Sequence, residues 1–110
     1  VVSGVNNRAE IAREEVFGPV LVVLPYHGED EALALANDSE YGLSGSVYSQ
    51  SRERAMEFAK RVRVGSMNVN GGLFYGADAP YGGYRGSGIG RQNGIEGFDQ
   101  YVETKTVGTM

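Results

Sequence analysis

The sequence predicts an α/β fold with a largely parallel sheet, because three strand-like segments alternate with two helix-like ones. The run at 20–24 is continuously apolar, as in a buried strand. The segments at 43–48 and 66–70 follow turn residues at 37–42 and the helix-ending Gly65, and we expect a strand at each. The stretches at 28–37 and between Ser51 and Gly65 each have an apolar side, as in helices that cover a sheet. Strand, helix, strand, helix, strand is the order that gives parallel strands joined by helical crossovers.

The N-terminal third contains a loop, a strand and a helix. Residues 1–15 show no period, and we expect a loop there with a short helical turn at 9–13. The run at 20–24 is continuously apolar and lies between two prolines, which predicts a strand buried on both faces. Acidic side chains fill the first turn of the helix at 28–37, where they complement the helix dipole.

The rest of the chain contains one further helix, a long loop and a terminal strand. Ser49 or Ser51 is expected to cap the second helix. Its apolar positions keep the three-and-four spacing of a one-sided helix, and these are Ala55, Phe58, Ala59 and Val62. Most of the 17 glycines fall in 71–97, which predicts a long loop. The segment at 101–107 is rich in Thr and Val and alternates as a strand does.

The composition limits the partners and the chemistry. With 110 residues there is room for one domain, and a net charge of −4 argues against nucleic acid as a partner. The chain has no cysteine and one histidine, His27, so we expect no metal site. No apolar run reaches the roughly 20 residues of a membrane span and no signal peptide is evident, so we expect a cytoplasmic protein without a membrane partner. The small size and the first residue, a valine, suggest a fragment or a processed product.

Two blocks contain candidate binding residues. Glu15 and Phe17 precede the run at 20–24; a carboxylate accepts both hydroxyls of a ribose, and an aromatic ring lies against a planar one. Taken alone, the pair is better explained as a surface charge and a core residue. Tyr75 and Tyr81 follow the strand at 66–70, where aromatic side chains can wall an apolar substrate channel. The alternative is that both tyrosines pack against the domain.

The glycine-rich block at 82–91 is not interpreted as a dinucleotide-binding loop. Its glycines recur at close spacing, but that motif requires a hydrophobic strand before it and a helix beginning at its last glycine. Residues 81–85 do not have the composition of such a strand.

Four blocks together resemble the aldehyde dehydrogenase superfamily. They are EEVFGPV at 14–20, ANDSEYGLSGSVYS at 36–49, PYGGYRGSGIGR at 80–91 and GFDQYVETKTV at 97–107. The resemblance implies that 1–86 is the C-terminal part of the catalytic domain, with a βαβαβ arrangement. It further implies a glycine-rich connecting segment at 87–101 and an oligomerisation strand at 102–110.

The resemblance also assigns roles to individual residues. Glu15 matches the glutamate that binds the nicotinamide ribose, and Phe17 matches the aromatic residue beside the nicotinamide. Tyr75 and Tyr81 fall on positions that line the aldehyde tunnel. The segment from Val102 to Met110 matches the strand that joins a partner subunit, so a homo-oligomer is expected. Arg85 stands where lysine is usual, and no role beyond structure is assigned to it.

The implied activity is oxidation of an aldehyde to a carboxylic acid with NAD or NADP. In the family the cysteine nucleophile, the glutamate base, the asparagine oxyanion donor and the cofactor domain all precede the region that this chain resembles. Without a cysteine, thiohemiacetal formation is excluded, so no catalytic residue is assigned and the chain is expected to be inactive alone. Two alternatives stay open: an acylating or semialdehyde dehydrogenase of the same superfamily, and a non-catalytic module that binds partners by strand exchange.

Overall fold

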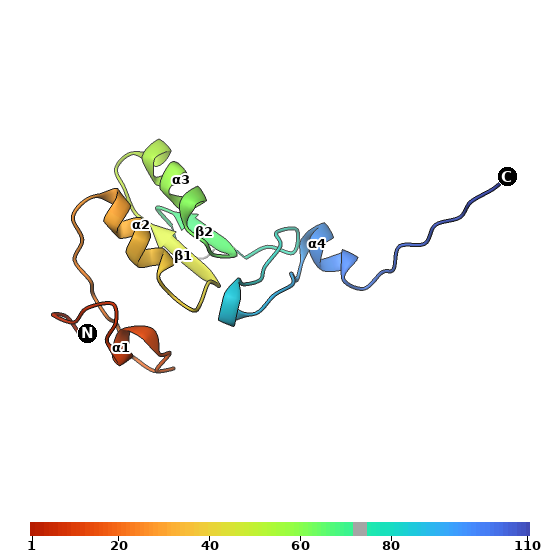
Figure 1. Cartoon of the computed structure of the whole chain (residues 1–110). Helices are drawn as coiled ribbons and strands as arrows, with labels where there is room; N and C mark the ends of the chain where they lie inside the picture. Colours follow the sequence, from red (N-terminus) through yellow and green to blue (C-terminus); the bar gives the residue numbers. More distant parts are fainter. Residues whose placement is uncertain (72–74) are drawn as a thin grey trace.

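The computed structural model describes residues 1–71 and 75–110. Figure 1 shows a central α/β unit, an N-terminal segment beside it and a C-terminal tail that runs away from both. In chain order the elements are α1 (Glu10–Arg13), α2 (Glu29–Asn37), β1 (Ser44–Val47), α3 (Arg52–Arg61), β2 (Ser66–Val69), the 3-10 turn η1 (Arg85–Ser87) and α4 (Gly94–Asp99). None of the helices in the described ranges is long and apolar enough to cross a membrane.

The central unit is a parallel strand pair with a helical crossover. β1 and β2 pair in register from Ser44 opposite Ser66 to Val47 opposite Val69. The crossover helix α3 packs on both strands, and α2 packs on α3. Ion pairs join the two helices, between Arg54 and Glu29 and, over 3.1 Å, between Arg61 Nη2 and Asp30 Oδ1. The α/β prediction is therefore confirmed, with two paired strands in the described chain.

Polar side chains fix the ends of this unit. Ser51, of the two serines considered, caps α3: its hydroxyl accepts the Arg54 N–H over 3.2 Å. Asn70, just beyond β2, binds the backbone of Ser49 twice, accepting its N–H and donating to its carbonyl, each over 2.8 Å. Because Ser49 follows β1, these two hydrogen bonds hold the carboxyl ends of β1 and β2 together.

The predicted strand at 20–24 is wrong for the described chain. One isolated parallel bridge joins Val2 to Val22, through hydrogen bonds from Val2 N–H to the Leu21 carbonyl (2.7 Å) and from Val23 N–H to the Val2 carbonyl (2.9 Å). Leu21 is 59% exposed. A strand buried on both faces needs other elements packed over both faces of its sheet. Within the described ranges the run has one bridge, and Val20, Leu21 and Val23 stay exposed.

The long loop predicted at 71–97 contains more structure than expected. It includes η1, the start of α4 and an antiparallel bridge between Tyr81 and Gln92. The helix was missed because Gly94 and Gly97 both lower helix propensity. The part of the predicted loop at 72–74 lies outside the described residues.

The tail is exposed along its whole length, and 103–110 form no β-pairing in the described chain. A strand needs a partner for its backbone groups. The predicted pairing of this tail with another subunit stays a prediction.

Gly65 allows the glycine-rich segment to lie against the start of β2. A Cβ atom built at Gly65 would stand 1.5 Å from the Gly82 carbonyl oxygen, so no larger residue fits without backbone movement. The Gly65 N–H also donates to the Gly42 carbonyl over 3.1 Å. The close approach of Gly82 to Gly65 brings the segment that follows Gly82 alongside the strand pair.

We predict that Gly65→Ala destabilises the protein by about 3 kcal/mol or more, because the added methyl group meets backbone rather than a movable side chain. The measurement is the apparent melting temperature of the variant against wild type. Gly108→Ala is the control, since nothing lies within 4 Å of a Cβ atom there. Equal melting temperatures for the two variants would show that the close approach is not a constraint.

Candidate functional site

Glu15 and Phe17 lie on an exposed segment that begins where α1 ends. The Glu14 N–H donates to the Glu10 carbonyl over 2.9 Å, and the chain turns again where the Val20 N–H donates to the Gly18 carbonyl over 2.7 Å. Between these turns the segment borders a hollow of about 310 Å³. Its lining residues are Ile11, Glu14, Glu15, Val16, Phe17, Gly18, Val20 and Val22.

Phe17 has an unusual conformation for an aromatic residue. Its φ is 52°, in the left-handed region that a bulky side chain rarely adopts. Its side chain is 94% exposed, so the fold of the described chain does not bury the ring in exchange for this strain. Strained backbone of this kind is concentrated at ligand sites, and an exposed planar ring is available to stack on a ligand.

Tyr75 and Tyr81 meet each other at a second place. Their ring centroids lie 5.3 Å apart with an interplanar angle of 72°, an edge-to-face contact. They border a small hollow of about 70 Å³ beside Ser66, Met67 and Asn68 of β2. Tyr81 is held by reciprocal 2.7 Å backbone hydrogen bonds with Gln92, whereas Tyr75 is 62% exposed.

The structure thus brings the two tyrosines together, and it brings Glu15 and Phe17 together, in two separate hollows that share no lining residue. No group of three or more metal-ligating side chains occurs in the ranges that the structure describes.

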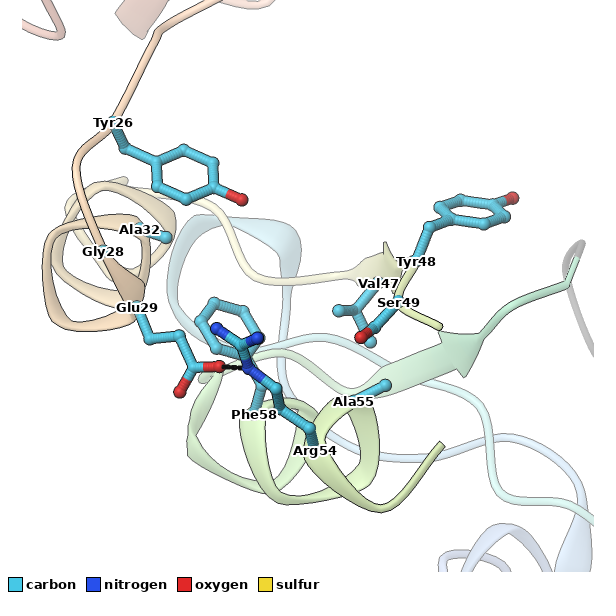
Figure 2. Close-up of a pocket in the computed structure, with 10 residues that line it drawn as sticks. All are labelled: Tyr26, Gly28, Glu29, Ala32, Val47, Tyr48, Ser49, Arg54, Ala55 and Phe58. Atoms are coloured by element: carbon cyan, nitrogen blue, oxygen red, sulfur yellow. Dashed lines mark hydrogen bonds and ion pairs between the residues drawn. The ribbon is translucent and has the colours of Figure 1, made fainter. Parts of the chain in front are cut away.

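A third hollow, of about 330 Å³, was not anticipated from the sequence. It lies between α2, α3 and the end of β1, and Figure 2 shows Arg54 reaching across it to Glu29. The hydrogen bond and the charge of Glu29 raise the pKa of Arg54 further above its ordinary value. The charges of Arg54 and Glu29 are paired with each other, and the ion pair links α3 to α2.

The turn at 37–39 connects the Glu15 segment to the central unit. Arg13 Nη1 lies 3.0 Å from Asp38 Oδ1, and it donates to the Asp38 carbonyl over 2.7 Å. Hydrogen bonds from Arg13 and then Asn7 lower the pKa of the Asp38 carboxyl. Asp38 is therefore charged at neutral pH. The sequence offered one signal for this role, the ANDSEYGL block, but no spacing rule links 38 to 13.

Arg85 binds the same turn from the other side. Its Nη1 donates to the Asn37 carbonyl over 2.8 Å and also to the Ser39 carbonyl. A cation at the carboxyl end of α2 satisfies carbonyls that the helix leaves open and complements the helix dipole. Arg85 therefore has a structural role at the carboxyl end of α2.

Comparison with known proteins identifies the family. The model of the aldehyde dehydrogenase family matches residues 1–107. The chain belongs to the aldehyde dehydrogenase family. The resemblance seen in the sequence is therefore confirmed over nearly the whole length.

Curated relatives of this aldehyde dehydrogenase chain act on different aldehydes. It is 50% identical to 3-succinoylsemialdehyde-pyridine dehydrogenase from a Pseudomonas species and 47% identical to geranial dehydrogenase from Castellaniella defragrans. Each match covers 97% of this chain and 22% of the relative. The chain therefore spans about a fifth of the length of these enzymes.

Solved aldehyde dehydrogenases have the same fold over this region. Betaine aldehyde dehydrogenase from Staphylococcus aureus matches with a TM-score of 0.90 and 43% identity, over 94% of this chain and 21% of that one. A mutant of aldehyde dehydrogenase C from Pseudomonas syringae, in complex with NAD+ and octanal, matches with a TM-score of 0.87 and 47% identity, again over 94% and 21%. The α/β unit is thus part of an aldehyde dehydrogenase catalytic domain.

Proposed function

We propose that this chain forms part of a longer polypeptide (the complete enzyme) that oxidises an aldehyde to a carboxylic acid with NAD or NADP. The observation that carries the proposal is Phe17, an exposed aromatic ring on strained backbone beside Glu15, in a chain of this family. Solved relatives in complex with NAD+ support the choice of cofactor for the complete enzyme.

A second candidate is oxidation of a semialdehyde, a reaction of the same superfamily. It is favoured by the 50% identity to a succinoylsemialdehyde-pyridine dehydrogenase. The two candidates differ in substrate, and the same residues serve both.

Glu15 and Phe17 fit the nicotinamide end of the cofactor. The Glu15 carboxylate is an acceptor-only group suited to ribose hydroxyls, and the Phe17 ring is free to lie against a planar ring. When bound, the cofactor supplies the hydride acceptor. Glu15 and Phe17 bind and orient it, and their shared hollow of about 310 Å³ suits one end of a dinucleotide.

Tyr75 and Tyr81 are proposed to line the aldehyde tunnel. Their edge-to-face contact brings two aromatic rings that carry hydroxyl groups together beside β2. A tunnel wall of this kind is slightly more polar than one built from phenylalanine. It selects among aldehydes by size and apolar contact rather than by charge.

The reaction needs groups that these residues do not contain. The 110 residues include no cysteine, so this chain offers no thiolate for attack on the aldehyde. We therefore expect the chain alone to be inactive. We also propose a cytoplasmic location for the complete enzyme, and a homo-oligomer joined through the tail at 102–110.

The role of Glu15 is tested by Glu15→Gln in the complete enzyme. Hydride transfer in a single turnover should slow about 10- to 100-fold, because misplacement of a reacting ring costs rate steeply, while the Kd of NAD+ changes less. Glu14→Gln is the control, since Glu14 borders the same hollow without a proposed cofactor contact. An unchanged hydride step in Glu15→Gln would retire the assignment.

The tunnel is tested by Tyr75→Ala and Tyr81→Ala in the complete enzyme. Each should change kcat/KM by different factors for short and long aldehydes, a discrimination of about 1–3 kcal/mol at most. The control is Tyr26→Ala, which removes from another hollow a tyrosine about as exposed as Tyr75. A uniform loss across aldehydes with a lower melting temperature would instead identify both tyrosines as packing residues.

The oligomerisation role is tested by deletion of 102–110 from the complete enzyme. Loss of these backbone partners should shift the sedimentation coefficient toward the monomer, since an unpaired strand in one subunit implies an unpaired edge in the other. A truncated enzyme that sediments as the wild type does would contradict strand exchange.

A further inference from the structure

The turn at 37–39 receives contacts from three distant parts of the chain. On one side the Asn37 side chain binds the end of α3: its Nδ2 donates to the Arg61 carbonyl over 3.1 Å, and its Oδ1 accepts the Arg63 N–H over 2.7 Å. On another side, Arg85 binds the carbonyls of Asn37 and Ser39. The turn is therefore fixed to the central unit independently of the N-terminal segment.

The N-terminal segment reaches this turn through Asp38. Asn7 Nδ2 donates to Asp38 Oδ2 over 2.8 Å and to its carbonyl over 3.1 Å. Arg13 Nη1 lies 3.0 Å from Asp38 Oδ1 and donates to the Asp38 carbonyl over 2.7 Å. One residue thus receives four contacts, and Arg13 stands only two positions before Glu15.

Within the described chain, few other contacts hold the N-terminal segment. α1 has four residues, far fewer than an isolated helix needs for stability, and none of them is buried. The bridge between Val2 and Val22 does not connect the segment to the central unit, because these two residues flank α1 and the bridge lies within the segment. In the described chain, the direction in which α1 leads into Glu15 therefore depends on Asp38.

We propose that Asp38 is a positioning residue, which holds Glu15 and Phe17 in their place for the cofactor by anchoring Arg13 and Asn7. The proposal rests on the cofactor role proposed for Glu15 and Phe17. Further support comes from a hollow of about 680 Å³ that Arg13, Glu15 and Ser39 border together. The turn and the cofactor segment are therefore neighbours across one surface.

The simpler interpretation is an ordinary surface ion pair. The Arg13 and Asp38 side chains are 32% and 56% exposed, and exposed pairs stabilise folds little. The two interpretations differ in what they affect. A surface pair changes stability slightly and nothing else, whereas a positioning residue changes cofactor binding and the hydride step.

The test uses the complete enzyme with Asp38→Ala, with NAD+ and NADP+ each titrated separately. We expect the cofactor Kd to rise and single-turnover hydride transfer to slow, so that the hydride-transfer rate constant divided by Kd falls about tenfold, with the aldehyde KM unchanged. Arg13→Lys, which keeps the charge, should stay within about twofold of wild type. Asp30→Ala is the matched control: it removes an aspartate paired with arginine at a similar distance at the other end of α2, and it should leave both quantities unchanged.

A double variant connects the effect to Glu15. If Asp38 acts through Glu15, adding Asp38→Ala to Glu15→Gln should cause a further loss much smaller than Asp38→Ala causes in wild type. If Glu15→Gln is impaired but Asp38→Ala matches Asp30→Ala, the positioning role is overturned and the cofactor assignment stands. If Glu15→Gln itself has no effect, the cofactor assignment falls, and the positioning role falls with it. A lower melting temperature with unchanged cofactor Kd and hydride step would also overturn the positioning role.

Discussion

Hydrogen bonds from three parts of the chain converge on the turn at 37–39, which links those parts to one another. Asp38 accepts hydrogen bonds from the N-terminal segment, and the Asn37 side chain binds the backbone at the end of α3. Arg85 of the glycine-rich segment donates to the Asn37 and Ser39 carbonyls. A helix end leaves several carbonyls without partners. At the carboxyl end of α2 these carbonyl oxygens accept hydrogen bonds from Arg13 of the N-terminal segment and from Arg85 of the glycine-rich segment.

Apolar packing contributes little to the described chain. Ala55, at 1% exposure, is the one apolar side chain in its described part that is buried, and Val20, Leu21 and Tyr26 are 41–59% exposed. The radius of gyration is 17.8 Å, against roughly 13 Å for a compact domain of this length. Exposed apolar surface on this scale marks contact faces. It agrees with a chain that spans about a fifth of the length of its relatives.

Phe17 has no side-chain hydrogen bond to offset its backbone strain, in contrast to Asn70 and Arg85. Asn70 and Arg85 also adopt the left-handed conformation, with φ of 54° each. Both side chains make hydrogen bonds that offset the strain, Asn70 to Ser49 and Arg85 to the end of α2. The Phe17 ring can make no such bonds and is 94% exposed. The cofactor contact proposed for Phe17 would account for both features.

The sequence by itself determined the elements whose signals are local. The helices α2 and α3, their crossover order and the strands β1 and β2 follow from apolar spacing, capping and turns, and the family follows from four ordered motifs. Tertiary structure decided what depends on distant partners. The run at 20–24 is as apolar as a buried strand, yet its pairing depends on neighbours that no local pattern specifies. Likewise, the sequence identified Glu15 and Tyr81, but only the folded chain connects residue 13 to 38 and 85 to 37, because hydrogen bonds across loops follow no period.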